Sequence, residues 1–436
     1  MHHKGRFPNV FFGANLRPDS AALAILILLL FLIFVLLFMT LTAQPAQAQT
    51  FRVLHNFTGG QDGAFPEAGL TMDKAGNSYG TTVYGGGGGC SGSLPGCGTV
   101  FKLSRQGPDW VLATIYSFQG GSDGYYPYAQ VVIGPDGSLY GTTYLGGRGC
   151  DGYGCGTVFK LRPGPNATGS WTETVLYRFT GSPDGFGPNA AVVFDQAGNL
   201  YGTTFVGGSH GSGAVFQLTP SGGSWTENVL YSFTSGNDGS YPISGVIFDQ
   251  VGNLYGTTTS GGGSPVCSCG TIYQLMRSGS GWTEKVLYRF QGGSDGAFPY
   301  AGLIFDGSGN LFGATGRLGS GVGGTVFELT PSGGNWTFDL LYSFTGQGGP
   351  WDSLVMDAAG NLYGTTRWDG LYQDGSVFRL SLSHGGWTET DLYSFNGLSD
   401  GGNPFSGVIL DEKGHLYGTA VDRGAYGYGV VWEVTP

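Results

Sequence analysis

Six segments of the chain place an aspartate among glycines and just before a proline, usually with an aromatic residue between them. They read GGQDGAFP (59–66), GGSDGYYP (120–127), GSPDGFGP (181–188), SGNDGSYP (235–242), GGSDGAFP (292–299) and GLSDGGNP (397–404). The aspartates are Asp62, Asp123, Asp184, Asp238, Asp295 and Asp400. Their carboxylates could supply oxygen ligands to Ca²⁺ or to hydroxyl-bearing ligands, although no D-x-D-x-D-G calcium loop occurs. The alternative is structural, because an aspartate in such a turn also caps nearby backbone amides.

Aromatic residues next to these aspartates extend the candidate binding set. A tyrosine ring beside a carboxylate suits glycan binding, because the ring can stack on one face of a sugar. Packing of the same rings against a neighbouring repeat explains them equally well. The candidates are Tyr125, Tyr126, Tyr241 and Tyr300.

The patterns that would indicate catalysis are weaker. G-x-S-x-G occurs at 207–211, 120–124 and 292–296, but chance matches are expected with 85 glycines, and a nucleophile elbow needs a strand-to-helix turn. His210 and His384 are isolated in loops. A glutamate recurs in the triplet WTE, where we expect solvated charges on outer strands that discourage edge pairing. These glutamates are Glu173, Glu227, Glu284 and Glu389. We predict no catalytic residue, no cofactor and no metal site.

A repeated glycine motif shows which elements must position these residues. LYGTT or a close variant occurs seven times, at 78–82, 139–143, 200–204, 254–258, 311–315, 362–366 and 416–420. Such recurrence indicates units that bury their faces against their neighbours. Each unit divides into an apolar strand such as GVIFD (245–249), the LYGTT strand, a third strand such as GTVFKL (98–103) and a fourth such as TETVLYRF (172–179). Four antiparallel strands make one propeller blade.

The phase of the repeats predicts how the structure closes. The first fourth-strand copy, FRVLHNF (51–57), precedes the first complete unit, and the last unit ends with a third strand, VVWEVTP (430–436). An N-terminal strand that completes the last blade would close a ring and remove the exposed edge. We therefore predict one all-β, seven-bladed propeller over residues 51–436. The strand-interior glycines should lie where an aromatic ring of a neighbouring strand approaches.

The same parse places the long, variable loops on one face of the propeller. In an up-down-up-down blade, the connections from strand four to one and from strand two to three emerge on the same side. That side carries all three cysteine pairs and the six aspartate segments. We expect the aspartates to ring the inner mouth of the propeller, and function to lie on this loop-rich face.

The repeats resemble the GloVer tandem repeat of exported bacterial proteins. The residues that carry the likeness are DxxGNLYGTT, GTVFKL and WTETVLYSF, for example 195–204, 156–161 and 171–179. The resemblance covers roughly residues 51–436 and implies an exported, propeller-like repeat protein. It implies no catalytic residue and no substrate.

The N-terminus and the cysteines both point to export. Residues 21–41 are an uninterrupted apolar run, and Ala46-Gln47-Ala48 has the form of a signal-peptidase site. We predict a signal peptide over 1–48, with an uncleaved membrane anchor through residues 21–41 as the alternative. The cysteines form three local pairs, in which disulfides are favoured over zinc because no histidine stands at ligand spacing. The pairs are Cys90 with Cys97, Cys150 with Cys155, and Cys267 with Cys269.

Charge and composition narrow the choice of partner. The formal net charge is −11, and no basic stripe that could follow phosphates is visible, so nucleic acid is not expected. We predict a secreted or extracytoplasmic, non-catalytic binding or scaffold protein that engages a glycan, a protein or a surface polymer through the loop-rich face. The alternative is an extracytoplasmic lyase or hydrolase acting on polysaccharide. The sequence does not indicate the oligomeric state.

Overall fold

The computed structural model describes residues 49–90, 95–164, 170–264, 267–279, 281–319 and 323–436. The chain divides into two compact units, Met1–Ala48 and Gln49–Pro436, and only the second contains described residues. The predicted signal peptide or anchor therefore lies outside them. No helix in the described part of the chain has the length and apolar character that a membrane span requires.

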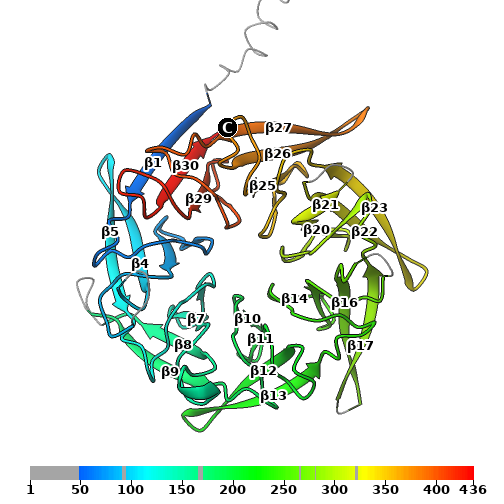
Figure 1. Cartoon of the computed structure of the whole chain (residues 1–436), viewed down its shortest axis with the longest axis horizontal. Coiled ribbons are helices and arrows are strands. Elements are labelled where there is room, and N and C mark those ends of the chain that lie inside the picture. The colour runs from blue at the N-terminus through cyan, green and yellow to red at the C-terminus, as the bar shows by residue number, and fades with distance from the viewer. Residues whose placement is uncertain (1–48, 91–94, 165–169, 265–266, 280, 320–322) are drawn as a thin grey trace, which may run out of the picture. The chain divides into compact units, whose positions relative to one another are not determined.

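The described residues form seven four-stranded antiparallel sheets arranged as blades in a ring (Figure 1). Blade 1 contains β2 (Thr71–Met72), β3 (Ser78–Thr82), β4 (Thr99–Gln106) and β5 (Asp109–Ser117). Blade 2 contains β6 (Val132–Ile133), β7 (Leu139–Thr143), β8 (Thr157–Arg162) and β9 (Thr172–Arg178). Blade 3 contains β10 (Val193–Phe194), β11 (Leu200–Thr204), β12 (Ala214–Ser221) and β13 (Ser224–Ser232). Blade 4 contains β14 (Ile247–Phe248), β15 (Leu254–Thr258), β16 (Thr271–Ser278) and β17 (Gly281–Arg289).

The remaining blades follow the same order. Blade 5 contains β19 (Ile304–Phe305), β20 (Leu311–Thr315), β22 (Thr325–Ser332) and β23 (Asn335–Ser343). Blade 6 contains β24 (Val355–Met356), β25 (Leu362–Thr366), β26 (Ser376–Ser383) and β27 (Gly386–Ser394). Blade 7 contains β28 (Ile409–Leu410), β29 (Leu416–Ala420), β30 (Val430–Thr435) and the N-terminal β1 (Thr50–Asn56). Two short strands, β18 (Asp295–Ala297) and β21 (Arg317–Gly319), pair on their own, and η1 (Cys150–Gly152) is a single 3₁₀ turn.

The ring closes as the sequence predicts. β1 pairs with β30 in an antiparallel register that runs from Thr50 opposite Thr435 to Asn56 opposite Val430. In Figure 1 the blue β1 lies beside the red β30, so the two ends of the repeat region share one blade. This pairing gives blade 7 its outermost strand and confirms the predicted seven-bladed propeller.

Apolar side chains from adjacent blades form the core. One cluster combines Tyr140 and Val158 of blade 2 with Leu200 and Phe216 of blade 3, and all of them are buried. The strand-interior glycines make room for these rings, as predicted. A Cβ on Gly141 would lie 2.6 Å from Phe159 Cζ, closer than the two carbons can approach. The glycine of each LYGTT motif is thus required by an aromatic residue on the third strand of its own blade.

Hydrogen bonds from the LYGTT motif join neighbouring blades. The Thr142 hydroxyl of blade 2 donates to the Ala190 carbonyl of blade 3 at 3.1 Å. The same bond joins blade 7 to blade 1, where Thr419 donates to the Ala68 carbonyl at 3.0 Å. Blade 5 has Ala314 at the corresponding position, which provides no hydroxyl.

The DxxGN turn between the first two strands explains the tyrosine of LYGTT. In blade 3, Asp195 Oδ1 accepts hydrogen bonds from the amides of Ala197 and Asn199, each at 2.9 Å. The Tyr201 hydroxyl donates to Asp195 Oδ2 at 3.0 Å. One aspartate therefore fixes both the turn and the ring of the following strand.

Candidate functional site

The residues that directly follow seven recurring prolines meet in a central cavity. The cavity has a volume of about 530 Å³ and opens among the inner ends of the blades. Each blade contributes the side chain after its proline. These seven side chains are Glu67, Tyr128, Asn189, Ile243, Tyr300, Trp351 and Phe405.

The segment before each proline holds this residue in place. In blade 2, Tyr126 takes a positive φ of 58°, its amide donates to the Cys97 carbonyl, and its carbonyl accepts from the Tyr144 amide, both at 3.1 Å. The next residue, Pro127, packs so closely on Gly98 that a Cβ there would lie 2.6 Å from Pro127 Cδ. The backbone is therefore wedged between two blades, and residue 128 faces the cavity.

A second row of lining residues follows the LYGTT motif directly. In blades 2 and 3 these are Tyr144 and Phe205, which also line the cavity. Both rows lie where strand four leads to strand one and strand two leads to strand three. The two connections pair with each other, for example Tyr125 with Leu145. The cavity therefore lies on the predicted loop-rich face.

Blades 5 to 7 place an arginine among aromatic rings at the edge of this cavity. Arg367 follows the LYGTT motif of blade 6, and its guanidinium carbon lies 4.6 Å from the Trp351 ring, 4.0 Å from Trp368 and 4.1 Å from Phe405. We name these four residues the arginine cage. Arg317 lies 5.9 Å from Trp351 and 6.0 Å from Trp368, and Tyr300 stacks on Trp351 with ring centroids 4.2 Å apart.

The acidic and basic groups of the site affect each other through partial burial. Burial raises the pKa of Glu67 to about 7, and the positive charge of Arg367 opposes this shift. Burial lowers the pKa of Arg367 to about 10, Glu67 opposes the change, and nearby Arg317 adds to it. Burial and the Glu67 charge also raise the pKa of Tyr128. Glu67 is therefore a lining carboxyl whose pKa lies near neutral pH.

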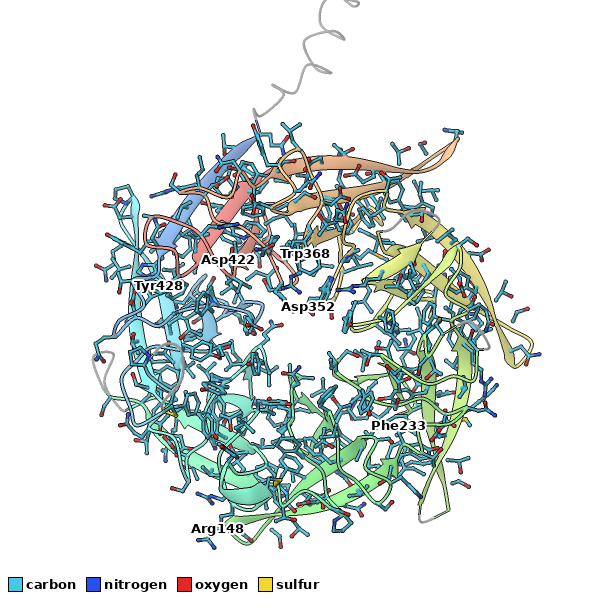
Figure 2. All side chains as sticks on the ribbon, in the orientation of Figure 1. Arg148, Phe233, Asp352, Trp368, Asp422 and Tyr428 are labelled. Atoms are coloured by element: carbon cyan, nitrogen blue, oxygen red, sulfur yellow. A yellow bond between two sulfur atoms is a disulfide. The ribbon has the colours of Figure 1, made fainter. Side chains whose placement is uncertain are left out.

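Several buried polar atoms of the site have no hydrogen-bond partner within the described residues. They are Asn189 Oδ1, Trp351 Nε1 and Arg367 Nε. Asp352, by contrast, accepts from the Ser353 amide at 2.6 Å and from the Gly407 amide of blade 7 at 2.8 Å. Figure 2 shows Asp352 at the central opening. Unpaired donors and acceptors beside a cavity are available to a ligand.

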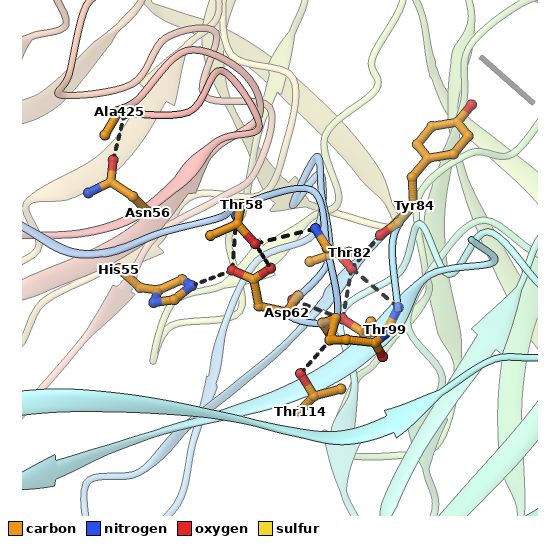
Figure 3. Close-up of polar contacts among 11 residues, drawn as sticks. His55, Asn56, Thr58, Asp62, Thr82, Tyr84, Thr99, Thr114 and Ala425 are labelled. Atoms are coloured by element: carbon orange, nitrogen blue, oxygen red, sulfur yellow. Dashed lines mark hydrogen bonds and ion pairs between the residues drawn. The ribbon is translucent and has the colours of Figure 1, made fainter. Parts of the chain in front are cut away.

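The six predicted aspartates lie elsewhere. Asp123 accepts from the Gln119 amide at 2.9 Å and from the Tyr116 hydroxyl of the outermost strand at 3.0 Å. Asp62 caps the amide of Thr58 at 2.9 Å and contacts His55 at 3.1 Å (Figure 3). Asp184, Asp238, Asp295 and Asp400 make the same tyrosine and backbone contacts.

The capping interpretation of these aspartates is therefore confirmed, and their expected position at the inner mouth is wrong. They follow the outermost strand, whose tyrosine holds the carboxylate, and within the described residues none of them lines the cavity. That they bind a ligand stays a prediction.

Of the four predicted tyrosines, only Tyr300 lines the cavity in the described structure. Tyr125 donates its hydroxyl to the Tyr153 carbonyl at 3.0 Å. Tyr126 packs on Tyr84 with centroids 4.9 Å apart, and Tyr241 packs on Phe205 at 5.2 Å. These three rings join neighbouring loops.

The glutamates of the WTE triplet are not the solvated charges we expected. Burial raises the pKa of Glu173, Glu227, Glu284 and Glu389 to about 7. A neighbouring aspartate adds to the shift, for example Asp123 beside Glu173. The outer strands pack blade against blade, so that one face of each strand is covered.

The six cysteines pair within their own loops. Cys90 bonds to Cys97, Cys150 to Cys155, and Cys267 to Cys269. No group of three or more histidine, cysteine or acidic residues in the described segments is arranged to hold a metal.

Sequence reasoning missed Glu67, Trp351 and the arginine cage. A signal was present, because residues 67, 128, 189, 243, 300, 351 and 405 vary in type while the repeats around them stay similar. The break in the sixth repeat, GQGGPWD (346–352), marks the same place.

Comparison with models of protein families assigns the chain to one family. The chain belongs to the Gloeobacter/Verrucomicrobia repeat family, whose model matches residues 39–167, 151–351 and 319–436. This match confirms the resemblance that the repeats indicated. Among curated protein sequences, none matches this chain.

Solved structures resemble the chain only distantly. A structure from Bacteroides uniformis, provisionally called a 6-phosphogluconolactonase, is 14% identical with a TM-score of 0.46, over 74% of this chain and 84% of that one. A Dyadobacter fermentans protein of unknown function is 10% identical with a TM-score of 0.45, over 89% and 98%. A gluconolactonase from Xanthomonas campestris is 14% identical with a TM-score of 0.37, over 64% and 78%. Because these TM-scores are all below 0.5, the three structures indicate no function for this chain.

Proposed function

We propose that this protein is an exported, non-catalytic binding protein that takes a glycan into the central cavity. The main support is the variation among the side chains that follow the recurring prolines. Seven repeats that share the LYGTT framework each direct one side chain into the cavity, and this position holds six different residue types while the proline before it recurs in every repeat. A purely structural position would repeat with the framework around it.

The lining chemistry supports a sugar as the ligand. Tyr128, Tyr300, Trp351 and Phe405 supply rings for stacking, and Asn189 supplies a buried oxygen without a partner in the described structure. A volume of about 530 Å³ lies within the range of ligand sites, which combine apolar walls with a few polar groups. Export is supported by the three disulfides, because such bonds persist in oxidising compartments.

A binding assay tests this proposal. Protein produced from the full-length coding sequence is applied to an array of glycans and polysaccharides. Trp351→Ala should weaken binding by about thirtyfold, because truncating a central aromatic contact costs about 2 kcal/mol. Tyr426→Ala is the matched control, since this exposed aromatic residue lies on the same face but outside the cavity. An array that stays empty, or equal binding by both variants, contradicts the proposal.

One observation favours the alternative function, an enzyme acting on polysaccharide. Glu67 has a pKa near 7, which suits a general acid or base. Incubation with the polysaccharides that bind should release no new reducing ends or unsaturated products if the protein is a binder. Product formation that Glu67→Gln abolishes would establish the enzyme instead.

A further inference from the structure

Arg367 is enclosed by aromatic rings, and no hydrogen-bond acceptor contacts its guanidinium within the described residues. Three rings lie within 4.6 Å of its guanidinium carbon. In the described structure the side chain donates no hydrogen bond and forms no ion pair, and its buried Nε is unpaired. A guanidinium carries five N–H donors, which match the planar fork of a carboxylate.

The cage also faces the cavity. Trp351 and Phe405 line it, and Arg367 occupies the repeat position at which Tyr144 and Phe205 line it in blades 2 and 3. Arg367 and Trp368 are not among the lining residues, so Trp351 and Phe405, whose rings contact the guanidinium, join the cage to the cavity.

A second cation strengthens the local positive potential. Arg317 is exposed, approaches the same two tryptophans, and lies close enough to Arg367 to influence its protonation. Within the described residues neither Arg317 nor Arg367 forms an ion pair, in a chain of net charge −11. The charge of Arg317 disfavours the charged form of Arg367, so an anionic ligand would relieve this repulsion.

The charges of Glu67 and Asp422 favour the charged form of Arg367, but neither acid forms an ion pair with it within the described residues. Asp422 is held by Asn403 Nδ2 at 2.9 Å and by Arg423 at 3.7 Å. Glu67 interacts with Arg367 only at long range, because no ion pair joins them within the described residues.

We propose that Arg367 and Arg317 bind the carboxylate of an acidic sugar residue, a uronate, whose ring lies against the Trp351–Tyr300 stack. The inference rests on the proposed glycan-binding function and specifies its ligand class. Arg367 donates two hydrogen bonds to the carboxylate, and Arg317 attracts the carboxylate at longer range. The rings of the arginine cage hold the guanidinium plane in position.

Titration calorimetry with matched oligosaccharides tests the inference. The probes are hexagalacturonate, a hexamannuronate and a hyaluronan hexasaccharide, with methyl-esterified hexagalacturonate and maltohexaose as neutral counterparts and a sulfated galactan hexasaccharide, which contains no uronate, as the sulfated one. At least one uronate should bind about tenfold or more tighter than the neutral sugars, and salt should weaken it. Arg367→Gln should reduce that affinity about tenfold to hundredfold, and Arg317→Gln should reduce it less.

The controls distinguish two negative results, one that overturns only uronate binding by the arginines and one that also overturns glycan binding in the cavity. Arg148→Gln removes an exposed charge from the same face, at the outer rim in Figure 2, and should leave binding unchanged. Melting curves show whether Arg367→Gln is folded, and Arg317→Gln supplies a second variant at an exposed position. Binding of neutral sugars alone, or of the sulfated probe alone, overturns the inference but leaves the proposed function. Binding of no probe overturns the inference and, with an empty array, the proposed function too.

Discussion

The junction between blades 2 and 3 and the junction between blades 5 and 6 solve the same packing problem differently. At the first, Thr142 donates to the Ala190 carbonyl and Gly156 packs under Pro188. At the second, Ala314 replaces the threonine, and Gly324 packs against Gly349 instead of a proline. Trp351 of this second junction stands in the cavity with Arg317 and Arg367 beside it.

The difference separates framework from site. Where the repeat is complete, the threonine hydroxyl of the LYGTT motif donates to a carbonyl of the next blade, as Thr142 does. Where it departs from the pattern, bulky and charged side chains replace those contacts and several of their polar atoms are unpaired in the described structure. A departure that has no structural compensation indicates a position kept for another purpose.

The largest effect should come from filling the framework glycine of the regular junction. Gly141→Val places a branched side chain where a Cβ already lies 2.6 Å from Phe159 Cζ and 3.2 Å from Val131 Cγ1. We expect a loss of about 3 kcal/mol in the free energy of unfolding. Chemical denaturation measures it, with Gly293→Ala as the control because nothing lies within 4 Å of a Cβ there. A stable Gly141→Val variant would show that the glycine is dispensable.

Removing the bond between blades 2 and 3 should have the next largest effect. Thr142→Val keeps the shape of the side chain but leaves the Ala190 carbonyl without its donor. The free energy of unfolding should fall by about 1–2 kcal/mol. Equal stability of variant and parent would mean that the threonine bond does not distinguish this junction.

The partly buried glutamates of the outer strands should make the free energy of unfolding decrease as pH rises. We expect this decrease to be smaller than the effects of the two substitutions above. Burial raises the pKa of Glu227 in the folded state to about 7 from its ordinary value of 4.5. The folded state therefore holds the proton more tightly, and stability falls as pH rises from about 4.5 to 7. Asp195 has a lowered pKa in the folded state, so its contribution to the free energy of unfolding is lost as pH falls through the acidic range. Solvent screening limits each glutamate to about 1 kcal/mol or less.

Melting temperatures at pH 5 and pH 8 check this. The melting temperature should be higher at pH 5 than at pH 8, and Glu227→Gln should reduce this difference in melting temperature. Blade 5 provides an internal comparison, because Phe338 replaces the glutamate there and stacks on Tyr288 with centroids 4.2 Å apart. A higher melting temperature at pH 8 would contradict the assigned burial of these carboxyls.

The smallest effect should come from repairing the irregular junction. Ala314→Thr restores the hydroxyl that the other LYGTT motifs use to reach the following blade. We expect a gain of about 0.5–1 kcal/mol in stability with ligand binding retained. A loss of stability would show that this junction has no room for the bond, because blade 6 approaches differently.

The sequence by itself determined the framework. The blade number, the closing strand, the role of the motif glycine and the cysteine pairs all depend on contacts within one repeat or on a pattern repeated in every blade. Such contacts leave a local signature, as Gly141 with Phe159 and Asp195 with Tyr201 show. Seven copies of each signature made them visible.

Only the tertiary structure decided which side chains meet at the axis and which charges are buried. Glu67 lies far along the chain from Trp351 and Arg367, which flank the first two strands of blade 6, and none of the three matches a known motif. The six aspartates carried a clear motif but serve the turn after the outermost strand. Closing the ring brings one residue per blade to a common cavity. That convergence depends on the path of the whole chain, so no local pattern could specify it.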